Sequence, residues 1–352
     1  MTQDNLSSAA VVGLDLGDRT THLCALDADG EVLCRQKLPT TRGHFRKLFS
    51  SRPSLRVVIE AGSQSPWIFA ELTELGHCVH VADPRRVGPI LKSHRKTDRR
   101  DAQSLAQYEF GMPKVLGEVH HRSLEQQSQV SILRARDLLV RMRTHCIQHV
   151  RGTLKVFGIR APACDPGCFH GRVLEVLPIS LEGALLGVIE QLKALALQIK
   201  DYEKRLKKLA EEEVPTALRL QEVHGVGPLT SLAFVLTLAD PNRFRRSRDV
   251  GSWVGLAPRV SASGDRDPDL PISKTGDRYL RKLLIQCAHF MLGKFGRDSD
   301  LRRYGLRLLE RGGRGAKNRA VVAVARKLAV LLHKLWVSGE PYDPLRNSRL
   351  AA

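Results

Sequence analysis

The N-terminal quarter of the chain alternates short apolar runs with turn residues, a pattern typical of β-strands. Asp29-Gly30 favours a tight hairpin between the second and third runs. Ser65 and Pro66 suit the start of a helix, and Gly76 suits its end. The order strand, strand, strand, helix, strand, helix, strand predicts a mixed sheet with helices on its faces. The predicted strands are 11–16, 21–27, 32–38, 56–61 and 77–82, and the predicted helices are 43–50 and 65–75.

Two later stretches have a helical period instead. Residues 123–156 predict one long helix, whose arginines form either a solvated basic face or a contact with nucleic acid. Leu185–Leu209 has the clearest repeat, with apolar residues at two positions of every seven. A helix packed within one chain has a similar stripe, but the strict spacing favours a coiled coil with a second subunit. The repeating positions are Leu185, Leu192, Ile199 and Leu206, interleaved with Val188, Leu195, Tyr202 and Leu209.

Helix-breaking residues divide the chain between these two stretches. Pro162, Pro166 and Gly167 fall within 158–171 and indicate a domain boundary. Two long apolar-striped helices are predicted near the C-terminus, at 283–295 and 316–337. We therefore expect an α/β domain with a basic helical extension at 1–160, a linker and coiled coil at 161–214, and a mainly α domain at 215–352.

The charge of the chain indicates a polyanionic partner. Lys and Arg number 56 against 37 Asp and Glu, and the resulting net charge of +19 is spread along the whole length. Such an excess favours nucleic acid over a membrane surface. Aromatic residues make up only 5%, which argues against a platform that binds single strands mainly by stacking.

The sequence predicts a cytoplasmic protein. No apolar run reaches the ~20 residues of a membrane span, and the N-terminus lacks the layout of a signal peptide. The seven cysteines are scattered, so we expect reduced thiols. Cys164, Cys168 and His170 form the single cluster, a weak signal for zinc because no second pair of ligands follows.

An acidic pair stands within the basic stretch K-S-H-R-K-T-D-R-R-D at 92–101. Asp98 and Asp101 are spaced to share one face of a helix. An isolated pair of this kind is usually a solvated face with local ion pairs, but carboxylates among cations also suit a metal that faces a phosphate backbone. Asp15 ends the first predicted strand and Glu60 the fourth, so these acids meet the pair if the two strands are neighbours.

The motifs around these four acids resemble a known family. G-L-D-L-G-D-R-T at 13–20, V-I-E-A-G at 58–62 and K-T-D-R-R-D-A-Q-S-L-A at 96–106 are similar to the RuvC-like domain of DEDD-type insertion-sequence transposases. That family includes pilin-gene invertases and bridge-RNA-guided recombinases. The resemblance implies an RNase H-like fold, with Asp15, Glu60, Asp98 and Asp101 as catalytic ligands of Mg²⁺, or of Mn²⁺ as a possible substitute.

The stretch L-Q-E-V-H-G-V-G-P-L-T-S at 220–231 predicts two helices joined by a tight turn. Gly225 and Gly227 permit that turn, which is similar to a helix-hairpin-helix element. In such an element the amides at the start of the second helix hold a phosphate. A G-x-G sequence is a weak signal taken alone, and the basic composition of the chain supports it.

A second informative stretch spans 255–282 and is too rich in Gly, Pro and Ser to be helical before Asp277. Its pattern G-L-x-P-R…S-G…S-K-x-G…L-R-K resembles the C-terminal transposase domain of the same family. The nucleophilic serine of the family falls on Ser263, and Ser261 is the nearest competing assignment. An exposed loop serine is ordinarily a turn residue, but surrounding cations stabilise the charge of an attacked phosphate.

The resemblance covers 11–344 and implies a transposase or site-specific recombinase that joins DNA to Ser263 while Mg²⁺ assists. The alternatives are a Holliday-junction-type nuclease that uses water as the nucleophile, and a non-catalytic nucleic-acid-binding protein. Expected partners are double-stranded DNA, a guide RNA encoded by the element, and further copies of the chain in a dimer or tetramer joined by the coiled coil. We expect nucleic-acid contacts from Arg95, Lys96, Arg99, Arg100, Gly225, Gly227, Arg259, Lys274, Arg278 and Lys282.

Overall fold

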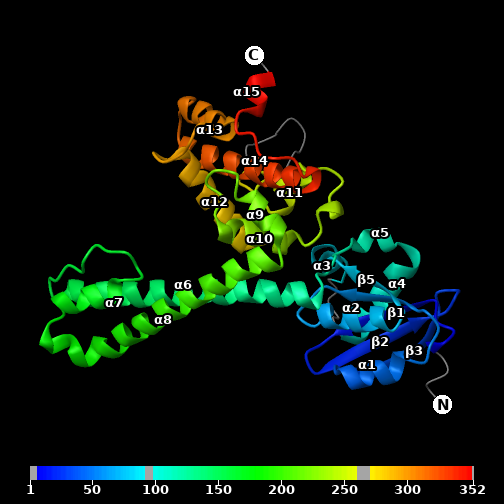
Figure 1. The fold of residues 1–352 in the computed structure, drawn as a ribbon. Coiled ribbons are helices and arrows are strands. Elements are labelled where there is room, and N and C mark those ends of the chain that lie inside the picture. The colour runs from blue at the N-terminus through cyan, green and yellow to red at the C-terminus, as the bar shows by residue number, and fades with distance from the viewer. Residues whose placement is uncertain (1–5, 92–97, 260–269, 351–352) are drawn as a thin grey trace. The chain divides into compact units, whose positions relative to one another are not determined.

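The computed structural model describes residues 6–91, 98–259 and 270–350. The chain divides into two compact units, Met1–Gln127 and Ser128–Ala352 (Figure 1). The first unit is built around a sheet, and the second is almost entirely helical. The expected combination of an α/β N-terminal domain and mainly helical later regions is therefore confirmed.

The sheet of the first unit has five strands in the order β3-β2-β1-β4-β5. The first three strands form an antiparallel meander, because each is joined to the next by a short turn. β4 and β5 run parallel to β1, because helices connect them. Their bounds are β1 Val11–Leu16, β2 Thr20–Leu26, β3 Val32–Pro39, β4 Arg56–Glu60 and β5 Cys78–Ala82.

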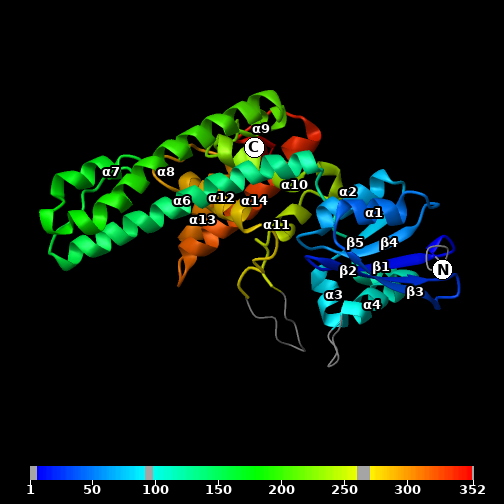
Figure 2. The same cartoon turned by 90° about the horizontal axis from the view of Figure 1, so that it is seen from below.

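Helices cover both faces of this sheet (Figure 2). One face buries Leu14, Val57 and Ile59 against the phenylalanines of α1, Phe45 and Phe49. The opposite face carries the alternate residues of the same strands and packs on α4. The helices are α1 Arg42–Phe49 and α2 Ser65–Glu74 on the first face, and α3 Pro84–Leu91, α4 Asp98–Gly111 and α5 Pro113–Leu116 on the second.

The second unit begins with a long antiparallel hairpin of α6 (Leu124–Val156) and α8 (Ile179–Glu212), seen side by side in both views (Figures 1 and 2). α7 (Phe169–Arg172) and η2 (Val173–Val176) lie in the connection. The heptad positions of α8 are buried within the chain, against apolar residues of α6 at one end of the hairpin and of the helical bundle at the other. The chain itself therefore supplies a partner helix for part of this seam, at Leu185 and Leu192. Val188 and Tyr202 are only half-buried, and the association of copies through a coiled coil remains a prediction.

The remaining helices pack around two central helices. α9 and α12 contact α10, which is buried from Thr230 to Leu238, and α11, α12 and α13 contact α14. α12 begins at Arg278, earlier than the predicted 283, because the side chain of Asp277 caps it through the N–H of Leu280 at 2.8 Å. No described helix is long and apolar enough to cross a membrane. The bounds are α9 Pro215–Leu220, α10 Pro228–Leu238, η3 Pro241–Arg243, α11 Asp249–Trp253, α12 Arg278–Leu292, α13 Asp300–Glu310, α14 Ala316–Ser338 and α15 Arg346–Leu350.

Candidate active site

Two of the predicted acids lie at the carboxyl ends of neighbouring inner strands, an end of the sheet that we call the acidic edge. β1 and β4 are parallel neighbours, with Leu14 paired to Ile59, so Asp15 and Glu60 are the next residues of the two strands. Side chains alternate along a strand, and Leu14 and Ile59 belong to the core under α1. Asp15 and Glu60 therefore face the other side of the sheet, which α4 covers.

The other two acids lie on the first turn of α4. Asp101 is buried and belongs to the stripe of α4 that packs on the sheet, and Asp98 precedes it by three residues. Gly13 allows this close packing. A Cβ on Gly13 would lie 2.3 Å from the carbonyl oxygen of Ala102 and 2.9 Å from the Cβ of Ala106. The helix thus crosses β1 two residues before Asp15.

A buried carboxylate fixes the far end of α4. Glu109 accepts a hydrogen bond from Nε of Arg56 at 2.7 Å and another from His80, whose second ring nitrogen contacts the carbonyl of Gly117 at 2.7 Å. Burial alone would raise the pKa of Glu109, but the bonds from His80 and Arg56 outweigh it and lower that pKa. Because Arg56 begins β4, α4 runs antiparallel to β4, and its acidic first turn lies towards the end that carries Glu60.

His22 also lies at this edge, and the sequence prediction missed it. His22 pairs with Asp15 across the β1–β2 ladder, and its Nε2 is 3.8 Å from Oδ2 of Asp98. It therefore connects an acid of α4 to the edge of the sheet. The alternation of β2 could have revealed it, because His22 is two residues before the buried Cys24 and shares its face.

The donor chemistry of this edge suits a divalent metal, because four carboxylates provide the hard oxygen ligands that Mg²⁺ prefers. The side chains do not form a closed set of ligands. Among residues 6–91, 98–259 and 270–350, no group of three or more His, Cys, Asp or Glu side chains could hold a metal ion. The side chain of Asp98 is 73% exposed to solvent. Cys164, Cys168 and His170, the weak zinc signal of the sequence, form no such group either.

Ser261 and Ser263 lie outside the described residues, but the structure defines the neck of their loop. This neck consists of residues 255–259 and 271–274, which pair in antiparallel fashion on either side of 260–269. The N–H of Arg259 donates to the carbonyl of Pro271 at 3.0 Å, and the N–H of Ser273 donates to that of Ala257 at 2.9 Å. Hydrogen bonds therefore join the described residues on the two sides of 260–269.

A buried arginine of α12 clamps this neck. Nη1 of Arg281 donates to the carbonyl of Val254 at 2.8 Å and to that of Thr275 at 2.7 Å. These carbonyls precede and follow the paired segments, so a single guanidinium joins both sides. Burial lowers the pKa of Arg281, and the two carbonyls compensate for removing the cation from water.

The predicted cations around the neck are exposed to solvent. Arg259, Lys274 and Arg278 all have exposed side chains. Lys282 is also exposed, and its Nζ is 3.2 Å from Oδ1 of Asp137 on α6. In the first unit, Arg99 and Arg100 are exposed on the first turn of α4. Arg95 and Lys96 lie outside the described residues.

The predicted glycine turn joins α9 to α10. Gly225 has a φ of +91°, a conformation that L side chains rarely adopt, and Gly227 is the N-cap of α10. The N–H groups of Thr230 and Ser231 donate to the carbonyl of Gly227 at 3.0 and 3.1 Å. Two helices joined by a tight turn are thus present, and the phosphate contact remains a prediction.

Comparisons with known proteins identify the class. Residues 12–159 match the family model for DEDD transposases of the IS110 type, and residues 217–304 match that of the "Transposase IS116/IS110/IS902 family". The transposase for insertion sequence element IS1111A of Coxiella burnetii is 30% identical over 351 residues, covering 96% of this chain and 92% of the relative. A probable family 20 transposase of Pseudomonas aeruginosa is 31% identical over 341 residues, covering 95% of this chain and 98% of the relative.

A more distant relative has a different described role. The pilin gene-inverting protein of Moraxella lacunata is 26% identical over 125 residues, covering 35% of this chain and 38% of the relative. The matches as a whole define a transposase, an enzyme that cuts and rejoins DNA. The chain belongs to the IS116/IS110/IS902 family of transposases.

Proposed function

We propose that this transposase cuts and rejoins DNA through a covalent phosphoserine link at Ser263. The serine oxygen attacks a backbone phosphorus, a P–O bond to the sugar breaks, and the released hydroxyl carries away the proton. The phosphodiester is exchanged for a phosphoserine ester, so rejoining by the reverse exchange needs no other energy source. The hydrogen-bonded neck supports this role, because it presents the loop from a base clamped by Arg281.

We further propose that Asp15, Glu60, Asp98 and Asp101 hold Mg²⁺ or Mn²⁺. A bound divalent ion would supply positive charge to the phosphate during the exchange. The observation that supports this proposal most is the contact of the first turn of α4 with β2 beside Asp15: Nε2 of His22, which pairs with Asp15, is 3.8 Å from Oδ2 of Asp98. A small movement of the first turn of α4 towards the sheet would bring the exposed carboxylate of Asp98 closer to Asp15 and Glu60.

Several finer assignments belong to the same proposal. We propose that the first unit is RuvC-like, which the mixed sheet and the acids at its β1–β4 edge support. We propose that the functional division is 1–160, 161–214 and 215–352. A guide RNA is proposed because the resembled family includes RNA-guided recombinases, and the net charge of +19 suits polyanionic partners. Loss of recombination after RNase treatment, and its return with the element's RNA, would support the RNA.

We also propose that copies of the chain associate through the outer surface of the α6–α8 hairpin. Leu138 and Leu197 are 49% and 64% exposed there. They line a groove of about 610 Å³ together with Leu139, Tyr202 and Arg205. Exposed apolar residues of this size favour an interface. Replacing Leu138 and Leu197 with Ser should lower the mass measured by light scattering, and an unchanged mass would exclude this surface.

The proposed function is tested by trapping the DNA adduct. Wild-type protein should form a metal-dependent covalent adduct with DNA that carries the ends of its element. Ser263→Ala should abolish the adduct and retain DNA binding, because binding depends mainly on the cationic surface and falls with salt. Ser261→Ala is the matched control and should retain the adduct. An adduct with Ser263→Ala would overturn the assignment, and cleavage without any adduct would favour the water-dependent nuclease.

A further inference from the structure

A large groove in the second unit borders the neck of the serine loop. Its volume is about 1210 Å³, larger than the roughly 300–1,000 Å³ of most small-molecule pockets. Pro258, Ile272 and Lys274 of the neck line one side. Tyr342, in the segment that follows α14, lines another. The size and open extent suit part of a polymer better than a compact metabolite.

Cations of α14 are spaced along this groove. The exposed residues that line it are Arg319, Arg326, Lys327 and Lys334. The first two and the last two are each seven residues apart, which places the four on one helical face. From Arg319 to Lys334 the helix rises by about 22 Å, the length of about six nucleotides at ~3.4 Å each. None of the four is within ion-pair distance of a carboxylate in the described residues.

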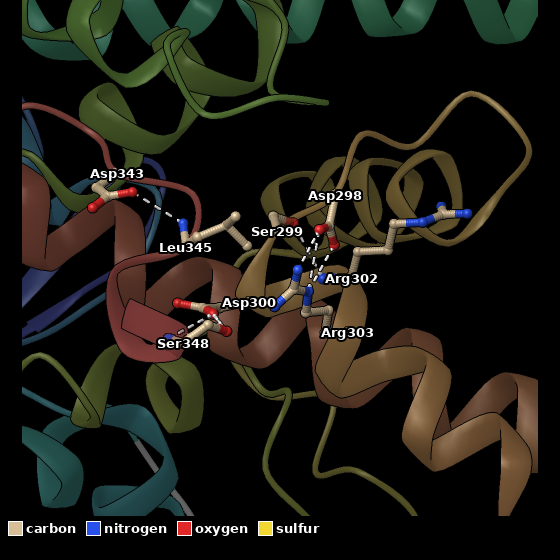
Figure 3. A network of polar contacts seen from close by, with 8 residues as sticks. All are labelled: Asp298, Ser299, Asp300, Arg302, Arg303, Asp343, Leu345 and Ser348. Carbon is tan, nitrogen blue, oxygen red and sulfur yellow. Dashed lines mark hydrogen bonds and ion pairs between the residues drawn. The ribbon is translucent and has the colours of Figure 1, made fainter. Parts of the chain in front are cut away.

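The acids at the groove are already engaged by the C-terminal segment. Oδ2 of Asp300 accepts from the N–H of Asn347 at 2.7 Å. Oδ1 of Asp300 accepts from the hydroxyl of Ser348 at 2.6 Å (Figure 3). Asp343 accepts from the N–H of Leu345 at 3.1 Å. These bonds hold the segment that forms the wall of the groove.

The third acid of the groove is paired in the same way. Glu340 forms an ion pair with Arg346, which lowers the pKa of Glu340. Lys334 lies near Glu340 and adds to that effect, but Arg346 is the closer partner. The acids of the groove therefore stabilise its wall and do not pair with the cations of α14. Lys327 lies over the ring of Tyr304 at 3.8 Å, and Arg319 donates to the carbonyl of Gly312 at 3.0 Å, so neither cation is neutralised by a carboxylate in the described residues.

The floor of the groove is apolar. Leu256, Val322 and Leu331 line it, together with Tyr304 and Tyr342. A row of cations above an apolar, partly aromatic floor suits a polyanion whose uncharged parts are flat and apolar. An unpaired nucleic acid strand has this chemistry, whereas a duplex keeps its bases covered. The strand processed at the adjoining serine loop is DNA, which favours DNA as the occupant.

Resting on the proposed function of the serine loop, we propose that this groove binds an unpaired DNA segment next to the cut position. Phosphates contact the cations of α14, and bases lie against the apolar floor. Lys327 and Lys334 are suitable positions for a test of the proposal, because they are seven residues apart and both line the groove. The groove thereby holds the strand beside the neck through contacts that do not depend on sequence.

The test measures binding of a fluorescein-labelled oligodeoxythymidine of about twelve nucleotides to full-length protein by anisotropy. Lys327→Gln with Lys334→Gln should weaken binding about tenfold. The slope of log K against log salt should fall in magnitude by about 1.4, as expected for two lost contacts with a single strand. Lys193→Gln with Lys200→Gln is the matched control, because these exposed lysines of α8 have the same spacing. This control should bind within about twofold of wild type.

Equal losses in both double variants would overturn the proposal, because net charge alone would then explain the effect. Duplex DNA that binds as sensitively to the groove substitutions would also overturn it. The proposal would also be overturned if the binding of RNA depended on Lys327 and Lys334 and the binding of DNA did not. A second measurement uses 5-iododeoxyuridine in the oligonucleotide: photocrosslinks should map to Tyr304 or Tyr342, and crosslinks confined elsewhere would contradict the groove.

These outcomes are separable from the chemistry at Ser263. Binding is measured with wild-type protein and with Ser263→Ala, and both should respond equally to the groove substitutions. A Ser263→Ala protein that still forms the adduct refutes the proposed function without affecting the groove. Groove variants that bind the oligonucleotide like wild type refute the groove without affecting the serine.

Discussion

The acidic edge of the first unit and the neck of the serine loop hold the residues of the proposed function by different means. At the edge, strand register places Asp15 beside Glu60, and a helix packed through Gly13 adds its first turn. At the neck, one guanidinium joins two irregular segments through carbonyl oxygens. Regular structure thus positions the acids, whereas a single side chain positions the base of the loop.

This difference predicts different sensitivities to substitution. A change at the edge acts either on a ligand directly or on the packing of α4, so its effects should be large. A change at the neck alters the presentation of the loop while the surrounding helices keep their core. The following predictions test that contrast.

The largest effect is expected when a carboxylate of the edge is neutralised. Asp15→Asn keeps the shape of the side chain but removes a charge from the proposed metal ligands, so strand transfer should fall by about 10³-fold or more. The rate of transfer between element ends measures this effect. Asp18→Asn, at a nearby exposed aspartate, should retain activity near the wild-type level. Similar rates in both variants would contradict the assignment of Asp15.

The packing of α4 is tested by adding one methyl group. Gly13→Ala places a Cβ against the backbone of Ala102, so the free energy of unfolding should fall by about 2 kcal/mol. Denaturant unfolding measures the change. Gly43→Ala is the control, because no atom lies within 4 Å of its added Cβ and alanine favours the helix. An unchanged stability for Gly13→Ala would mean that α4 does not pack closely on β1.

The neck is tested at its clamp. Arg281→Met removes both hydrogen bonds to the neck, and we expect adduct formation to fall about tenfold, equivalent to ~1.4 kcal/mol. Arg281→Lys should recover part of the loss, because it restores one cationic donor. Circular dichroism should show the helices intact, and Arg307→Met at an exposed position should have no effect. Adduct formation at the wild-type rate in Arg281→Met would exclude the clamp.

The smallest effect concerns pH and the anchor of α4. The hydrogen bond to Glu109 raises the pKa of His80 above its ordinary value of 6.5, despite burial. A raised pKa in the folded state adds stability that is complete below 6.5 and is lost as pH rises through the folded value. The difference in melting temperature between wild type and His80→Gln should therefore shrink from pH 6 upwards. A difference that grows with pH would contradict the anchor.

The sequence predicted the sheet and the neighbouring positions of Asp15 and Glu60, because both follow from local pattern. Strand alternation placed Asp15 and Glu60 at strand ends, and i,i+3 spacing placed Asp98 and Asp101 on one helical face. His22 was missed because a single histidine in a strand has no motif of its own. Its role depends on which strand lies beside β1.

The heptad repeat shows the limit of pattern in the second unit. An apolar seam requires a partner helix, but its spacing does not reveal whether the partner belongs to the same chain. Here α6 covers the seam of α8 at the end near Leu185 and Leu192. The clamp by Arg281 was equally invisible, because carbonyl acceptors can come from any residue. Contacts distant in sequence decide both features.

The central claim is that the acidic edge holds a divalent metal, and calorimetric titration with Mn²⁺ tests it most directly. Wild-type protein and Asp18→Asn should show the same saturable binding. A protein that carries both Asp15→Asn and Glu60→Gln, with unchanged circular dichroism, should lose that binding, because two hard oxygen ligands with negative charge are removed. Unchanged affinity and stoichiometry in the double variant would contradict the account.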